Sequence, residues 1–347
     1  GASRTLISSS SSSLRRHDDG IILRLPLVSP VRGIWSRMCK GCVQASMSGA
    51  TARPMGTVEG RFRSGAFGHA AHACAILSLC CRKRGARPTR LFDHHMHSTH
   101  SPDARASLDE LCESAIQCDL AGVCFTEHVD FDPSDAAYGY INYEEYLSDV
   151  DRCRDKYGDR LEIKAGIEVT YQSEYVDDIR RFLEAHQFDY VLGSVHLIDH
   201  TFIGSPAYFV GKSEAEACGP YWRETMAMLE SGRFTRIGHL DYIRTRWPRE
   251  YGLPGLARWR RSMTDILQLV IESGAIIEVN TSAIRRQLGG PYPNWETLEL
   301  YRRLGGTRVF MGSDAHNAPN VGQYFPEVAA RLEQTGLVIC SGCEVLC

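Results

Sequence analysis

Histidines and acidic residues of this 347-residue chain recur where short apolar runs end. Six of the ten histidines between residues 91 and 347 stand at such ends, each with an acidic or polar neighbour. A lone histidine is more often structural than a ligand, but scattered surface histidines would not fall at successive run ends. Imidazole and carboxylate groups together bind divalent zinc, manganese or iron, so the pattern predicts a metal site. The candidate ligands are His95, His97, Asp103, His128, Glu168, His196, His239, Asp314 and His316.

This set is larger than one metal ion needs. A zinc ion takes about four ligands, and a two-metal centre with bridging carboxylates takes roughly six to eight. His95 and His97 are two residues apart, so the period of a strand places both side chains on one face. We therefore expect two to three divalent ions, drawn from Zn, Mn and Fe.

For these residues to meet, the runs that carry them must be parallel strands. Apolar runs alternate with longer amphipathic stretches. The predicted strands are residues 91–95, 122–126, 161–168, 190–196, 236–240, 275–280 and 308–312. The predicted helices are residues 107–120, 143–157, 174–187, 213–231, 258–273, 294–304 and 321–335. Ser107, followed three residues later by Glu110, is a capping box that marks the first helix start.

Seven such βα units predict an α/β fold in which parallel strands close into a barrel. The carboxyl ends of the strands then converge on one mouth, where barrels of this kind place their chemistry. A doubly wound open sheet is the alternative. Its nucleotide-binding versions have no support, because no glycine-rich phosphate-binding motif follows a strand.

Charge divides the chain into two parts. Residues 1–90 contain 15 Lys and Arg and only three acidic residues, a net charge of about +12, whereas residues 91–347 carry about −15. An acidic body argues against a nucleic-acid partner, because it offers no face to replace phosphate counterions. No apolar run approaches the roughly 18 residues that a membrane span needs, which excludes a membrane-spanning protein.

Residues 1–88 form a low-complexity basic leader that we expect to be disordered, and residues 89–347 form the barrel domain. The leader contains a serine run and lacks periodicity. It resembles a transit peptide, but a disordered leader or an over-extended reading frame with starts at Met47 or Met55 is the simpler interpretation.

The chain contains 13 cysteines, whose spacing shows no disulfide framework. They are typical of reduced thiols in a cytoplasmic protein. The pairs Cys39/Cys42 and Cys340/Cys343 together would suit a structural zinc site. A chance origin is simpler, because the pairs lie at opposite ends of the chain.

Taken together, the motifs resemble the PHP superfamily, the polymerase and histidinol phosphatase group. The resemblance covers residues 91 to about 335 and rests on HxH at His95 and His97, SPD, TEH, GIE, SVH, GHLD and SDAH. Within the superfamily, GSVHLID, GKSEAEA, GHLDYI and EVNTSAIRR are most similar to the histidinol-phosphatase branch. The resemblance implies a distorted (β/α)7 barrel with a trinuclear divalent-metal centre that hydrolyses a phosphate monoester, with the nine residues above as ligands.

Other residues are expected to bind the substrate and to assist the reaction. Arg244 and Arg285 are candidates for binding the phosphate, with Asn280 as a further substrate-binding residue. Asp241 or His200 is a candidate general acid for the leaving alkoxide. A small cationic metabolite such as L-histidinol phosphate suits the acidic body. The oligomeric state stays open.

Two other functions compete with this hypothesis. An amidohydrolase also carries HxH on its first strand and an Asp on its last, and Lys164 would then be carbamylated; however, Lys164 lies four residues before the strand end. A catalytically silent metal-binding module of the same superfamily is the second. It is disfavoured because the ligand set is complete.

Overall fold

Seven apolar runs become parallel strands, as the alternation predicts. The computed structural model describes residues 90–342. Its strands pair in chain order, and they are β1 (Phe92–Met96), β2 (Gly122–Val129), β3 (Glu162–Thr170), β4 (Tyr190–Ser194), β7 (Arg236–Ile237), β8 (Ile276–Asn280) and β9 (Arg308–Gly312). The segment after β9 returns to β1, because Asp314 N donates to His95 O at 2.7 Å and His97 N donates to Ala315 O at 2.8 Å. The strands therefore form the predicted distorted α/β barrel.

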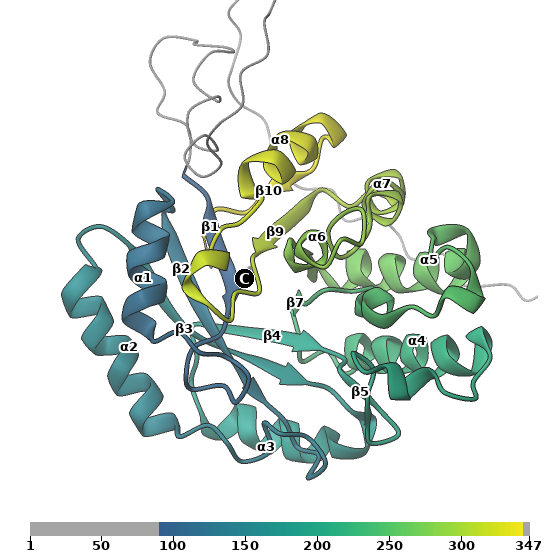
Figure 1. Ribbon diagram of the computed structural model, residues 1–347, viewed down its shortest axis with the longest axis horizontal. Coiled ribbons are helices and arrows are strands. Elements are labelled where there is room, and N and C mark those ends of the chain that lie inside the picture. Colours follow the sequence, from purple (N-terminus) through teal and green to yellow (C-terminus); the bar gives the residue numbers. More distant parts are fainter. Residues whose placement is uncertain (1–89, 343–347) are drawn as a thin grey trace, which may run out of the picture. The chain divides into compact units, whose positions relative to one another are not determined.

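Helices lie on the outer side of this curled sheet (Figure 1). They are α1 (Leu108–Gln117), α2 (Tyr143–Tyr157), α3 (Val176–Ala185), α4 (Glu214–Glu230), α5 (Leu256–Ser273), α7 (Trp295–Leu304) and α8 (Phe325–Thr335). The predicted capping box begins α1: Ser107 Oγ accepts from Glu110 N, and the Glu110 carboxylate accepts from Ser107 N at 2.8 Å. The apolar faces of the helices pack on the sheet and build the main hydrophobic core.

A second, smaller apolar cluster includes Phe92, Leu192 and Phe310 from the barrel strands. His94 packs on the rings of Phe92 and Phe310, with centroids 4.5 and 5.6 Å away. The pairing of β1 with β2 then shifts register between Asp93 and Met96. Beyond this shift, His95 and His97 approach each other on one side. β1 and the residue after it thus supply one histidine to the apolar cluster, His94, and two to the candidate site, His95 and His97.

Several short elements were not predicted. The hairpin of β5 (Leu197–Ile198) and β6 (Thr201–Phe202) follows β4, α6 (Ser282–Arg285) follows β8, and β10 (Val338–Ile339) pairs in parallel with the outer edge of β9. The 3-10 helices are η1 (Ser173–Tyr175), η2 (Pro206–Phe209), η3 (Tyr242–Arg246), η4 (Arg249–Tyr251) and η5 (Ala318–Asn320).

β7 is shorter than the predicted strand at 236–240. Its ladder with β8 ends after Ile237. His239 N donates to the carboxylate of Glu278 at 2.7 Å instead of to a backbone carbonyl of β8. The strand is therefore cut short at the point where its histidine enters the site.

The predicted leader, residues 1–88, lies outside the described residues, as do Cys39, Cys42 and Cys343 of the two cysteine pairs. Among residues 90–342, no helix has the length and apolarity required to cross a membrane.

One buried hydroxyl from α2 ties β2 to β3. Tyr146 Oη lies 2.8 Å from Gly166 O and 3.1 Å from Phe125 O, and it accepts from Gly166 N at 3.0 Å. Tyr146→Phe removes the hydrogen bonds of this hydroxyl to both strands, so the free energy of unfolding should fall by about 0.5–1.5 kcal/mol in urea titrations. The exposed Tyr140, changed to Phe in the same way, should show almost no loss. Equal stability of the two variants would contradict this role.

Candidate metal centre

The structure brings all nine predicted ligands to the carboxyl ends of the strands. Glu168, at the end of β3, lies at their centre with 1% of its surface exposed. Its Oε1 is 2.8 Å from His239 Nε2, and its Oε2 is 3.3 Å from His95 Nε2 and 3.2 Å from His128 Nδ1. His196 Nε2 is 3.5 Å from Oε1. Ligands from five different strands or strand ends therefore meet at one carboxylate.

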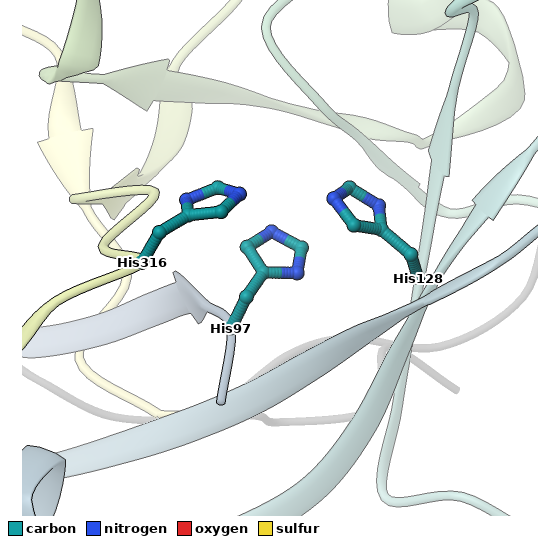
Figure 2. Close-up of side chains that lie close together, drawn as sticks. All are labelled: His97, His128 and His316. Atoms are coloured by element: carbon teal, nitrogen blue, oxygen red, sulfur yellow. The ribbon is translucent and has the colours of Figure 1, made fainter. Parts of the chain in front are cut away.

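A second part of the cluster joins the end of β1 to the segment after β9. The Nε2 atoms of His95 and His97 are 3.0 Å apart, and Asp314 Oδ1 is 3.6 Å from His97 Nε2. The rings of His128 and His316 flank His97, with centroids 4.0 and 4.5 Å from its ring, and the three rings approach each other in Figure 2. The site is therefore continuous from Glu168 to His316.

Asp103 completes the set at the solvent-exposed rim. Its Oδ2 is 3.0 Å from His316 Nε2 and its Oδ1 is 3.6 Å from His128 Nε2, and 56% of its side chain is exposed. The turn that carries it is fixed by the buried Glu127, which accepts hydrogen bonds from the hydroxyls of Ser98 and Ser101 at 2.7 and 2.6 Å. Glu127 of β2 thus holds the turn that carries Asp103.

The donor geometry fits divalent cations. His95 Nδ1 is 2.8 Å from the Glu278 carboxylate and His196 Nδ1 is 3.0 Å from Thr170 Oγ1, which leaves the Nε2 lone pairs of both rings for the site. Two Nε2 lone pairs about 3 Å apart repel each other unless a proton or a cation lies between them. Overlapping triads each bring three ligand atoms within 4.8 Å of one another, and they are His97–His128–His316, His95–His97–Asp314, His95–Glu168–His239 and His128–Glu168–His196.

The electrostatics of the site favour positive charge. Burial alone would raise the pKa of Glu168, but neighbouring histidines, His95 foremost, outweigh it and hold that pKa well below its ordinary value. Burial likewise opposes ionisation of Asp314, whose pKa neighbouring His95 and His316 keep low. Burial lowers the pKa of His196 to about 3, so this imidazole is neutral. Ionised carboxylates and neutral imidazoles are the forms that ligate metals.

A pocket of about 350 Å³ opens directly above the cluster. Six of the candidate ligands reach its wall, so a small molecule bound there would contact them. The remaining wall mixes acidic, aromatic and basic side chains, and it includes Asp130, Asp135, Thr170, Phe202, Tyr242 and Arg286. Arg286 lies with its guanidinium 5.8 Å from the Tyr242 ring centroid.

The expected phosphate-binding arginines occupy other positions. Arg244 is buried and pairs with Asp241 through Nε–Oδ2 and Nη2–Oδ1 contacts of 2.7 and 3.2 Å, and it also donates to Pro291 O at 2.7 Å. Arg285 donates to Ser313 O at 2.7 Å and to Asp314 O at 2.8 Å. Neither arginine lines the pocket, and neither does Asp241, because these groups brace the backbone around the site.

Asn280 and His200 also lie elsewhere than expected. Asn280 is fully buried, with Nδ2 3.2 Å from Glu278 and 3.4 Å from Asp314, so it contacts a ligand rather than the pocket. His200 stands on the two-residue turn of the β5–β6 hairpin, where its φ is +58°. It pairs with Asp132 at 2.8 Å and faces a different surface cavity. The hairpin carries it away from the metal ligands.

Lys164, the candidate carbamate of the amidohydrolase alternative, lies near the start of β3. Its Nζ is 2.9 Å from Glu162, and Glu168 occupies the mouth end of the same strand. This position disfavours a carbamylated metal bridge.

Two site residues were missed by the sequence analysis. Arg286 is the neighbour of the chosen Arg285, and only the local backbone decides which of the two faces the pocket. Glu278 stands two residues before Asn280 on β8, so strand periodicity could have placed it on the same face.

Comparison with known proteins identifies the class. The family model described as the PHP domain matches residues 93–282, which is more than half of the chain. The chain therefore belongs to the PHP domain family, as its fold and its histidine-rich strand ends indicate.

Several curated relatives are named histidinol-phosphatases. A "Probable histidinol-phosphatase" of Thermotoga maritima is 25% identical over 244 residues, covering 70% of this chain and 92% of the relative. The histidinol-phosphatase of Lactococcus lactis is 26% identical over 65% of this chain and 84% of its own length. The crystal structure of the histidinol phosphate phosphatase from Lactococcus lactis, complexed with zinc, L-histidinol and phosphate, matches with a TM-score of 0.66 at 24% identity, covering 74% of this chain and 98% of that one. This structural likeness shows the fold.

Glu168→Gln should remove metal without unfolding the barrel. The variant keeps the size of the side chain but loses the charge that faces the histidines. After equilibration with zinc and desalting, it should contain at least one zinc ion per chain less than the wild type. Elemental analysis checks this. Glu162→Gln, at the opposite end of β3 with 52% of its side chain exposed, is the matched control and should retain the full metal content. Equal metal content in both variants would argue against Glu168 as a ligand.

Proposed function

We propose that this chain is a metal-dependent phosphomonoesterase that converts L-histidinol phosphate and water into L-histidinol and phosphate, a step of histidine biosynthesis. The observation that carries the proposal is the convergence of six imidazoles and three carboxylates at the floor of a pocket sized for a small metabolite. The names of the relatives support the choice of substrate, since the Thermotoga maritima and Lactococcus lactis proteins are named a probable histidinol-phosphatase and a histidinol-phosphatase.

The proposed centre holds two to three divalent ions, of Zn, Mn or Fe, on His95, His97, Asp103, His128, Glu168, His196, His239, Asp314 and His316. Bound there, the ions would supply Lewis acidity, activating water and neutralising phosphate charge. Zinc has direct support from the similar Lactococcus lactis structure, which contains it.

Arg286 is the pocket residue that we assign to the phosphate. It is the arginine of the pocket wall, and its planar guanidinium suits two phosphate oxygens at once. The Tyr242 ring, which lies between Arg286 and the ligands His196 and His239, orients this side chain. Phosphate would therefore lie between the metal ligands and Arg286.

Other residues of the pocket wall suit a cationic leaving group. Asp130 and Asp135 add carboxylates to the pocket beyond the metal ligands, and Phe202 adds an exposed aromatic face. Histidinol carries an ammonium group, which carboxylates attract, and an imidazole ring, which stacks on aromatic faces. This combination favours a small phosphorylated amine over a neutral phosphomonoester.

The remaining predicted residues act on the site's geometry in this proposal. Asp241 and Arg244 form a buried ion pair at the start of η3, Arg285 holds the carbonyls of Ser313 and Asp314, and Asn280 holds the Asp314 carboxylate. We place the protein in the cytoplasm, where the buried thiols of Cys112, Cys153 and Cys218 stay reduced.

Phosphate release tests the proposal directly. The purified protein should release phosphate from L-histidinol phosphate faster than from glycerol phosphate, and dialysis against a chelator should abolish this activity until a divalent metal is restored. A panel of phosphomonoesters separates an enzyme from a catalytically silent module. Turnover that survives complete removal of metal, or no turnover on any member of the panel after metal loading, would refute the function.

Replacing Arg286 by Ala should lower kcat/KM for the phosphate ester about 10–100-fold, the loss expected for a charge-assisted pair with phosphate. Metal content should stay unchanged, because Arg286 contacts none of the ligands through a hydrogen bond. Arg261→Ala, on the exposed face of α5, is the control and should behave as wild type. An Arg286 variant with wild-type kcat/KM would exclude this residue from phosphate binding.

A further inference from the structure

Glu278 lies in the middle of β8, fully buried behind the metal ligands and outside the pocket wall. Its Oε1 is 2.8 Å from His95 Nδ1, and its Oε2 accepts from His239 N at 2.7 Å. The Asn280 amide donates to the same Oε2 at 3.2 Å. A single carboxylate therefore connects β8 to two ligands that belong to β1 and to the segment after β7.

From these contacts we propose that Glu278 is a positioning residue that sets the tautomer of His95 and the place of His239 in the metal centre. The proposal rests on the proposed metal function. An ionised carboxylate only accepts hydrogen bonds, so the proton on His95 must sit on Nδ1 and the Nε2 lone pair must face Glu168 and His97. Carboxylate–histidine–metal arrangements of this kind orient the ring and raise its basicity.

The groups around Glu278 admit no amide in its place. If the amide oxygen of a glutamine faced His95, its NH₂ group would meet the His239 N–H and the Asn280 amide, both of them donors. Asn280 cannot reverse at no cost, because its Oδ1 accepts from Ser282 N at 2.9 Å. If the glutamine turned the other way, its NH₂ would donate to His95 Nδ1 and drive the proton onto Nε2, where a metal has to bind.

Tight packing prevents the carboxylate from moving aside. Gly312, the last residue of β9, faces it so closely that a Cβ there would lie 3.0 Å from Glu278 Cδ and 2.6 Å from His95 Cβ. The missing side chain at Gly312 leaves room for the Glu278–His95 pair alone. A side chain substituted for Glu278 therefore cannot shift its position, and the substitution must change the hydrogen bonds to His95, His239 and Asn280.

The test compares zinc binding by wild type and Glu278→Gln after chelator treatment. We expect the zinc affinity, measured by competition with a chromophoric chelator, to fall about 10–100-fold. The rise in Tm that zinc produces should shrink accordingly, whatever the Tm of the metal-free variant. A merely structural role would lower the metal-free and zinc-bound Tm equally and leave the difference between them unchanged.

Asp132→Asn is the matched control. Asp132 is also a buried carboxylate that pairs with a histidine, at 2.8 Å from His200 Nδ1, but that histidine is not a ligand. This variant should keep the zinc affinity of the wild type. Equal zinc affinity of Glu278→Gln and wild type would overturn the proposal, as would an equal loss in Asp132→Asn.

A measurement on the wild type covers the case in which Glu278→Gln does not fold. In zinc-loaded protein, nitrogen NMR should show His95 protonated at Nδ1 and metal-bound at Nε2, and the opposite assignment would overturn the proposal. Failure of the wild type itself to bind zinc, manganese or iron would instead contradict the proposed function. The two failures are therefore distinguishable.

Discussion

Glu168 has to keep a negative charge where only 1% of its surface reaches solvent, and this requires positive charge close by. Five imidazoles lie within 3.5 Å of its oxygens, and Ser194 Oγ donates to Oε1 at 2.6 Å. Protons on the histidines can supply the missing charge, and divalent cations supply more of it at the same place. The folded chain therefore favours occupation by metal through the electrostatics of one buried carboxylate.

The barrel is distorted where this cluster demands it. The pairing of β1 with β2 shifts register between Asp93 and Met96, next to His95 and His97. The pairing of β7 with β8 ends after Ile237, and the backbone N–H of His239 donates to the Glu278 carboxylate. Irregularities of this type in barrel strands serve to aim side chains. The seven-strand ring is thus less regular than a (β/α)8 barrel because its interior holds polar ligands.

The sequence predicted the parts of the site that depend on strand ends. All nine candidate ligands meet, since parallel strands in a barrel deliver their last residues to one mouth. It failed where the position depends on tertiary contacts. Nothing local distinguishes Arg285 from Arg286, and the buried pairing of Arg244 depends on Asp241 and on a carbonyl 47 residues away. His200 was misplaced because the hairpin of β5 and β6, four paired residues in all, is too short to leave a periodic signal.

The depth of the ligands also ranks the positions that ions would occupy. His95 and Glu168 are sealed inside the barrel, whereas His128, His316 and Asp103 expose 15%, 21% and 56% of their side chains. A chelator in solution would meet His128, His316 and Asp103 first. It would reach the inner ligands only after the ion held by these three residues has left. Partial removal of metal would therefore empty the outer position before the inner one.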